Sequence, residues 1–174
     1  ALPVSMTSRA TELVEARNGS VVLTQTSGAA IMSAASDPFV CLAADTNGRF
    51  VVPGFMPAFD ATATFASLLD LLAATDSSLS EVLDALPVVF MVTREVVTPW
   101  EQKGAVMRVL VEQSKSREID LVDGVRIHHP DGWALVLPDP DDPITRVTAE
   151  GTDQASAERL ADEYARRIER LVRS

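Results

Sequence analysis

Short apolar runs separated by glycine-containing turns dominate the second half of the chain. The runs 119–122, 125–129 and 133–137 are each long enough to form a β-strand. Asp123-Gly124 separates the first two runs, and Pro130-Asp131-Gly132 separates the second from the third. Tight turns of this composition join neighbouring antiparallel strands. This half of the chain is therefore predicted to be built on an antiparallel sheet.

Two helices are predicted beside these strands. After a strand over 88–97, Thr98-Pro99-Trp100-Glu101 offers an N-cap, a proline at the first helical position and a glutamate at the third. A further strand over 144–149 precedes an amphipathic helix over 153–172, which is acidic at its start and basic at its end. Residues 88–174 are therefore predicted to form an α+β domain, with a four-stranded antiparallel sheet and two helices on one face.

The first half alternates strand-like and helix-like segments at short spacing. Strands are expected over 21–23, 39–42 and 50–52, and helices over 8–17 and 28–35. Asp60 is a candidate N-cap for a longer helix, whose apolar residues at 65, 68, 69 and 72 have the spacing of one buried face. Ser78 and Glu81 have capping-box spacing at a last short helix, which Pro87 closes. Residues 1–87 are therefore predicted to form a three-layer α/β domain.

The composition argues against several classes of function. A net charge of -10 opposes binding to nucleic acid and anionic membranes, and opposes phosphorylated ligands unless basic groups gather locally. No apolar run approaches the roughly 18 to 20 residues of a membrane span, so a cytoplasmic protein is expected. Cys41 lies in an apolar run and is predicted to be a small buried residue. The chain opens at Ala1, inside an apolar segment, which suggests a piece of a longer protein.

The motifs of the second half resemble the last domain of the phosphomannomutase/phosphoglucomutase family, the phosphohexomutases. That family reads there approximately as D-G-V-[KR]-[IV], then G-W-x-L-[VL]-R-P-S-[GN]-T-E-P-x-x-R-V-x-x-E-A. The corresponding stretches here are Asp123-Gly124-Val125-Arg126-Ile127, Asp131-Gly132-Trp133-Ala134-Leu135-Val136 and Pro143-Ile144-Thr145-Arg146-Val147-Thr148-Ala149-Glu150, before a final amphipathic helix. The first half resembles the family's third domain less closely. The resemblance implies a domain III-like part over 1–87 and a domain IV-like part over 88–174.

The resemblance also implies what this chain lacks. Family members isomerise hexose phosphates between the 1- and 6-phosphate, using a phosphoserine in the first domain and a magnesium loop, D-G-D-x-D-R, in the second. Neither motif is present in this sequence. We therefore expect no catalytic residue and no cofactor in this chain, with magnesium only in a missing second domain if the parent protein is active. The implied partners are the missing N-terminal domains and a hexose phosphate or nucleotide sugar, not nucleic acid or membrane.

The family's phosphate loop, R-P-S-[GN]-T-E-P, aligns with Leu137 to Pro143. Leu137 stands where the family has arginine, Asp139 where it has serine and Asp141 where it has threonine, while Pro140 has no N–H to donate. With Asp142, the loop carries three carboxylates. A carboxylate about 4 Å from a phosphate oxygen costs roughly 1 kcal/mol in water and about 4 kcal/mol at an effective dielectric constant of 20. The loop is therefore predicted to reject phosphate.

The family's sugar-recognition motif, G-E-x-S-G-H, is replaced by Ala44-Asp45-Thr46-Asn47-Gly48-Arg49. Gly48 is kept, Asp45 is an acid one methylene shorter, and Asn47 and Arg49 replace serine and histidine. The resemblance therefore assigns Asp45, Asn47, Gly48 and Arg49 to the sugar position. The same residues are ordinary turn chemistry, so a solvated polar turn is the alternative and the favoured interpretation.

Two places in the sequence invite a metal-binding interpretation. Asp139, Asp141 and Asp142 are a possible set of hard ligands for a divalent cation, but two prolines stiffen the loop and no ligand from elsewhere is identifiable. His128 and His129 alternate faces on a strand, so one is expected to point inward and one to water. No metal site is predicted.

Three functional hypotheses follow. The stretch from Trp133 to Pro140 resembles the mutase-like part of proteins in which a mannose-1-phosphate guanylyltransferase-type nucleotidyltransferase is fused to phosphomannomutase-like domains. The first hypothesis is therefore a non-catalytic part with degenerate sugar and phosphate loops, which serves assembly or regulation of the fused enzyme. The alternative is part of an active phosphohexomutase, and the third hypothesis is a ligand-sensing module.

Overall fold

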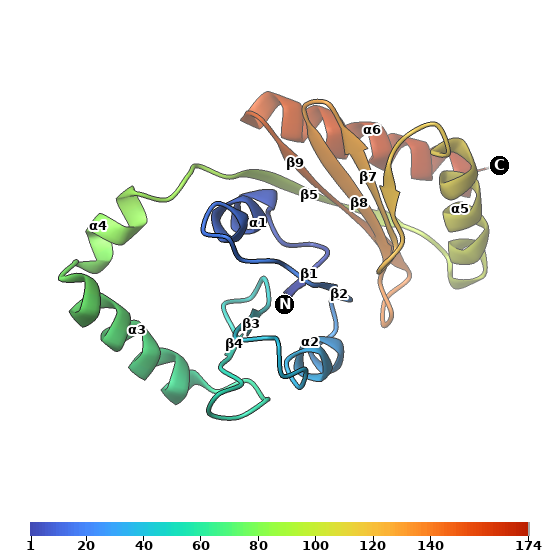
Figure 1. Cartoon of the computed structure of the whole chain (residues 1–174). Helices are drawn as coiled ribbons and strands as arrows, with labels where there is room; N and C mark the ends of the chain where they lie inside the picture. Colours follow the sequence, from blue (N-terminus) through green and yellow to red (C-terminus); the bar gives the residue numbers. More distant parts are fainter. Residues whose placement is uncertain (174) are drawn as a thin grey trace. The chain divides into compact units, whose positions relative to one another are not determined.

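The computed structural model describes residues 1–173, and the chain divides into two compact units. The first unit spans Ala1–Val88 and the second begins at Val89 (Figure 1). Each unit contains a hydrophobic core made only of its own residues. Each therefore has its own driving force for folding.

The second unit is built on a five-stranded antiparallel sheet. Its strands are β5 (Phe90–Val97), β6 (Ile119–Asp120), β7 (Val125–His129), β8 (Gly132–Pro138) and β9 (Ile144–Gly151). Their order in the sheet is β5-β9-β8-β7-β6. The antiparallel sheet confirms the prediction, but it has five strands instead of four, because all five segments predicted as strands in this half, including the short edge strand β6, join the same sheet.

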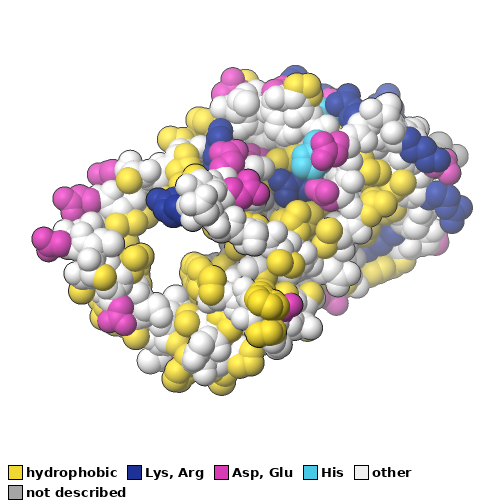
Figure 2. Space-filling model, viewed as in Figure 1, with side chains coloured by type: hydrophobic (Ala, Val, Ile, Leu, Met, Phe, Trp, Pro, Cys, Tyr) yellow, Lys and Arg dark blue, Asp and Glu magenta, His cyan; other side chains and the backbone are white. Residues whose placement is uncertain are grey.

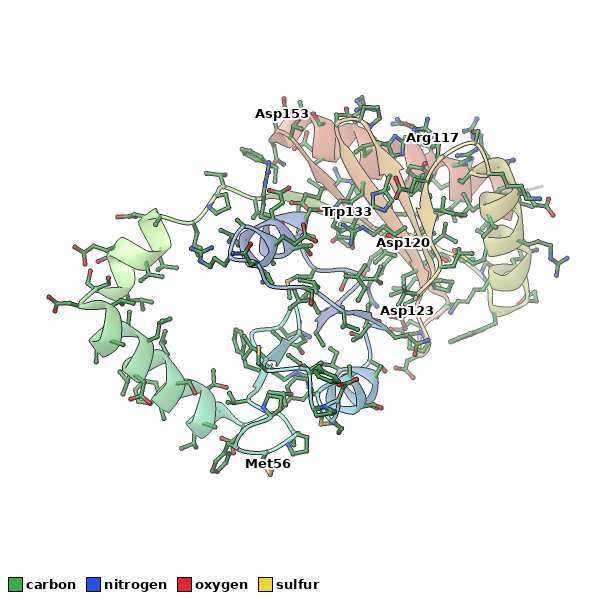
Figure 3. All side chains as sticks on the ribbon, viewed as in Figure 1. Met56, Arg117, Asp120, Asp123, Trp133 and Asp153 are labelled. Atoms are coloured by element: carbon green, nitrogen blue, oxygen red, sulfur yellow. The ribbon has the colours of Figure 1, made fainter. Side chains whose placement is uncertain are left out.

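Two helices accompany this sheet, α5 (Trp100–Gln113) and α6 (Gln154–Val172). Asp153 caps α6 at its start (Figure 3), where its Oδ1 accepts a hydrogen bond of 2.7 Å from the Ser156 N–H. The cap of α5 is Pro99, one residue later than predicted. The reason is that Thr98 still pairs with the segment before β9, since its N–H donates to Pro143 O at 2.8 Å.

Both helices pack on the same face of the sheet, as predicted. Val106 and Leu110 of α5 and Leu160, Tyr164 and Ile168 of α6 belong to one buried cluster. The strands contribute Val96 of β5 and alternate residues of β7, β8 and β9, as the period of a strand requires: Val125, Ile127, Ala134, Val136, Val147 and Ala149. The helices therefore cover one face and leave the other to the alternate side chains.

Glycine is required at the tight turn between β7 and β8. Gly132 has a φ of +149°, and a Cβ atom there would lie 1.9 Å from the Glu150 carbonyl oxygen of the neighbouring strand. No side chain fits at that distance. The sequence prediction of a tight turn at Pro130-Asp131-Gly132 is confirmed, and the close approach of β9 explains the glycine.

The first unit is an α/β arrangement with short strands. The strands β1 (Leu2–Pro3) and β2 (Leu23–Thr24) are parallel, and β3 (Ala43–Ala44) and β4 (Phe50–Val51) are antiparallel. The helices are α1 (Ser8–Glu15), α2 (Gly28–Ala34), α3 (Ala61–Thr75) and α4 (Leu79–Asp84). The α/β class agrees with the prediction. The strands predicted over 21–23 and 39–42 begin two and four residues later in the chain, at β2 and β3.

Two burial predictions for this unit are wrong. Cys41 is exposed, because the strand predicted around it begins only at Ala43. The helix capped by Asp60 is confirmed as α3, but Phe65 and Leu69 are 62% and 50% exposed instead of forming a buried face. Figures 1 and 2 show α3 leading away from the two small sheets of its unit, with hydrophobic side chains at its surface. Within residues 1–173, no helix is long and apolar enough to cross a membrane.

Candidate functional site

The loop at the predicted phosphate position is a tight connection between β8 and β9. Leu137 and Pro138 end β8, and β9 begins at Ile144. The Asp139 N–H donates to Ile144 O at 3.0 Å, and the Ile144 N–H donates to Asp142 O at 2.8 Å. These backbone bonds keep the two ends of the loop together.

The carboxylate of Asp139 is the centre of this loop. Its Oδ1 accepts hydrogen bonds of 2.8 Å from the backbone N–H groups of both Asp141 and Asp142. Its Oδ2 forms an ion pair with the guanidinium of Arg146 on β9. The Asp141 N–H bond, followed by those from Asp142 and Arg146, holds the pKa of Asp139 below its ordinary value, although desolvation opposes this effect. Asp139 is only 7% exposed, so its carboxylate is largely withdrawn from water.

Lys103, which no sequence motif singles out, fixes the other side of the loop. From α5, its Nζ donates to the carbonyl oxygens of Asp139, at 2.6 Å, and of Asp142. The same ammonium lies 3.6 Å from the centroid of the Trp100 ring. Lys103 is 36 residues from Asp139 in sequence, and no local pattern connects the two. Only the packing of α5 beside the sheet brings this lysine to the loop.

The remaining charges around the loop are mainly negative. Asp141 and Asp142 are exposed, and Arg146 is shared with Glu95 of β5, whose Oε1 lies 3.1 Å from the arginine Nε. Leu137 is half-buried and offers no polar group. Of the residues predicted at the phosphate position, the structure therefore brings Asp139 inward and leaves two carboxylates at the surface.

The loop at the predicted sugar position connects β3 to β4 and is also centred on an aspartate. Asp45 Oδ1 accepts bonds of 2.9 Å from the Asn47 N–H and 2.8 Å from the Arg49 N–H. Asp45 Oδ2 lies 2.6 Å from the Arg49 Nε. Burial would raise the pKa of Asp45, but these hydrogen bonds and the charge of Arg49 outweigh it, so the pKa lies below its ordinary value. Gly48 adopts a φ of +79° at the turn.

The predicted sugar residues therefore lie together, but their polar groups are largely used within the loop. The Arg49 guanidinium, besides its ion pair with Asp45, lies 4.5 Å from the centroid of the Phe59 ring. Next to it, a groove of about 440 Å³ is bordered by Gly48, Arg49, Phe59 and Phe65, among other residues of the first unit. Its walls are mostly apolar, so it offers few hydrogen-bonding groups to a sugar.

The two histidines of β7 use opposite faces of the strand, as predicted. His129 Nε2 lies 2.9 Å from Tyr164 Oη on α6, whereas His128 Nε2 lies 2.8 Å from Asp120 Oδ2 on β6. Among residues 1–173, no group of three or more His, Cys, Asp or Glu side chains is placed to hold a metal ion.

Comparisons with curated proteins find relatives among sugar-phosphate mutases. The chain is 31% identical over 163 residues to a probable phosphoglucosamine mutase of Methanopyrus kandleri, and the match covers 92% of this chain and 36% of that protein. It is 28% identical over 160 residues to a phosphoglucomutase/phosphomannomutase of Thermococcus kodakarensis, covering 91% of this chain and 34% of the relative. The chain thus spans about a third of the length of these relatives.

The fold comparison agrees with the sequence comparison. A phosphoglucomutase/phosphomannomutase family protein from Burkholderia thailandensis superimposes with a TM-score of 0.81 at 22% identity, over 98% of this chain and 37% of that one. No family model matches the sequence. The chain therefore has the fold of a part of these longer proteins, and its homologues are members of the phosphoglucosamine mutase and phosphoglucomutase family.

Proposed function

We propose that this chain is the C-terminal, phosphohexomutase-like part of a protein of sugar-phosphate and nucleotide-sugar metabolism, in which it serves assembly or regulation and does not grip the sugar phosphate. The main observation is the loop from Leu137 to Pro143, where Asp139 uses the backbone N–H groups of Asp141 and Asp142 and the guanidinium of Arg146. A phosphate needs such donors, and here an internal anion already holds them.

The electrostatics of the loop support this proposal. An incoming phosphate would displace the Asp139 carboxylate and would then face it together with exposed Asp141 and Asp142. Each like charge at about 4 Å costs roughly 1 to 4 kcal/mol, depending on the effective dielectric constant. Lys103 adds a positive charge near the loop, but its buried ammonium donates to the two carbonyl oxygens and is not presented to a ligand. The loop at Asp45 supports the same view, because its arginine is paired internally.

We further propose that the parent protein carries a nucleotidyltransferase fused to this chain. The likeness of residues 133–140 to mutase-like domains fused to a mannose-1-phosphate guanylyltransferase-type nucleotidyltransferase favours such a fusion. Residues 1–87 and 88–174 would then be the domain III-like and domain IV-like parts that help to assemble or regulate the fused enzyme. Sequencing the full-length gene tests this directly, since the region upstream of Ala1 would encode a nucleotidyltransferase.

The alternative function is part of a working phosphohexomutase, the class of enzyme that the names of the relatives give for those proteins. In that case the catalytic serine and the magnesium loop would lie upstream, and the phosphate would be held by residues outside the two loops. An upstream phosphorylatable serine together with a D-x-D-x-D loop would support this alternative and contradict the non-catalytic role.

Calorimetric titration of the chain with mannose 1-phosphate and glucose 1,6-bisphosphate tests the binding claim. We expect no saturable heat with ligand at millimolar concentration, because the donors are occupied. Micromolar binding by the unchanged chain would overturn the proposal. A thermal shift assay with a nucleotide sugar separates the remaining roles, since a raised melting temperature indicates a ligand-sensing module and no shift indicates a purely structural part.

A further inference from the structure

His129 of β7 contacts two parts of the second unit, the helix α6 and the connection between α5 and β6. Its Nε2 lies 2.9 Å from Tyr164 Oη on α6, and the two rings meet edge to face with centroids 5.7 Å apart. Its Nδ1 lies 2.7 Å from Arg117 Nη1, in the connection between α5 and β6. The imidazole therefore links this connection to the helix.

The chemistry of arginine fixes which nitrogen of His129 carries the proton. A guanidinium has only donors and does not lose its charge in proteins, so Nδ1 must be the acceptor. The proton of the neutral ring is then on Nε2, which donates to Tyr164 Oη. A second proton on Nδ1 would place an N–H and a positive charge directly against the guanidinium. Protonation of His129 is therefore incompatible with the Arg117 contact.

The surrounding charges do not cancel this conflict. Arg117 and Arg159 are the cations that act on His129, and Asp131 and Glu163 are the anions. Arg159 is in an ion pair with Asp131, so these two largely offset each other. Tyr164 is completely buried and uncharged at neutral pH, and burial raises its pKa further. Desolvation first, and Arg117 second, lower the pKa of His129 from its ordinary value of 6.5.

The connection held by Arg117 has few other attachments. Lys115, Ser116, Arg117 and Glu118 are all exposed. Two backbone hydrogen bonds hold this stretch: the Arg117 N–H donates to Ser114 O, and the His128 N–H donates to Glu118 O. The side-chain bond to His129 is thus a substantial part of what orders these residues.

We propose that His129 is an acid-sensitive latch, which in its neutral form ties residues 115–118 to α6 through Arg117 and Tyr164 and on protonation releases them. This device is independent of sugar-phosphate binding, and it gives the second unit a pH-dependent local conformation. The released stretch lies directly before β6, one of the two edge strands of the sheet, so we expect acid to loosen the sheet at that edge.

NMR titration of the full chain tests the latch. At pH 8 we expect the Nε2-protonated tautomer, and we expect a pKa for His129 below 6.5. The backbone amide shifts of residues 115–118 should follow the same titration. Arg117→Gln should move the pKa of His129 upward, because the adjacent charge is lost, whereas Arg166→Gln on the exposed side of α6 should leave it unchanged.

Three outcomes would overturn the proposal: an Nδ1-protonated tautomer at pH 8, a pKa at or above the ordinary value, or an unchanged pKa in Arg117→Gln. His129→Gln should abolish the pH dependence of residues 115–118. If that variant does not fold, the tautomer and the arginine variant still decide the question. Binding of a hexose phosphate would contradict the proposed function but would not affect these readouts.

Discussion

In each predicted ligand loop, one aspartate accepts hydrogen bonds from the backbone of the loop. Asp45 and Asp139 each accept two backbone N–H bonds on one oxygen and an arginine on the other. The carboxylate satisfies donors that a turn would otherwise expose to water or to a ligand. An aspartate in such a position therefore stabilises its own loop and competes with any external anion.

Asp139→Ala should lower the melting temperature of the second unit, because the N–H groups of two residues and the guanidinium of Arg146 lose their acceptor. Asp142→Ala is the matched control, since its exposed side chain accepts neither of these N–H bonds, and it should have little effect. Equal losses in the two variants, measured by thermal unfolding at pH 7, would contradict the role given to Asp139.

The pH dependence of this aspartate has a definite sign. The pKa of Asp139 is lower in the folded protein than in the unfolded chain, where it is about 3.9. The contribution of Asp139 to the free energy of unfolding is therefore fully present above about pH 4. It is lost as the pH falls through the pKa that Asp139 has in the folded protein. Below about pH 4 the difference between the unchanged chain and Asp139→Ala should shrink, which acid titration of both melting temperatures measures.

Among the helices and strands of the second unit, two glycines, Gly104 and Gly132, have opposite roles. Gly132 has a positive φ and approaches the Glu150 carbonyl, whereas Gly104 lies on the exposed side of α5, where a Cβ atom would have no neighbour within 4 Å. Position 132 requires glycine. At position 104, glycine destabilises the helix, because glycine loses more conformational entropy on folding than alanine does.

Gly104→Ala should therefore raise the free energy of unfolding by about 0.5–1 kcal/mol. Gly132→Ala should lower it strongly or prevent folding, because the backbone of β9 cannot move away without breaking the sheet. Chemical denaturation of both variants measures the two effects. A destabilising Gly104→Ala would mean that α5 is not the regular exposed helix described above.

Several elements were predictable because their signals are local. The capping box of Ser78 and Glu81 and the cap at Asp60 are present as expected. These motifs need only residues a few positions apart. Of the strands predicted in the first unit, β4 begins where expected, whereas β2 and β3 begin two and four residues later than predicted, because two-residue strands leave no alternating pattern that fixes their limits.

Across the whole chain, the two units differ in the size of their cores. The second unit buries residues from four strands and two helices in one cluster. The first unit has a small cluster of Ile31, Ala35, Ala43 and Val51, and none of the residues of α3 and α4, all of which the structure describes, is buried. Stability is therefore concentrated in the second unit.

Amide hydrogen exchange should reflect this difference. The slowest exchange is expected in β8, β9 and α6, because opening them exposes the large core. Amides of α1 to α4 should exchange faster, as opening them exposes little apolar surface. Mass spectrometry after peptide digestion measures both sets in one sample. Equal or greater protection of α3 would contradict the view that its apolar surface is uncovered.

The motifs of the second half carry the resemblance to the mutases. Local sequence patterns were sufficient to predict the antiparallel sheet and the two helices on one face. The turns, caps and alternation that encode these features act between residues close in the chain. The sequence also gives the charged residues of both ligand loops, but it does not predict their ion pairs and hydrogen bonds. The contacts of Lys103 and Arg146 with the loop at Asp139, and of Arg117 and Tyr164 with His129, arise only in the folded chain. They join separate elements, and their geometry exists only once the helices have packed on the sheet.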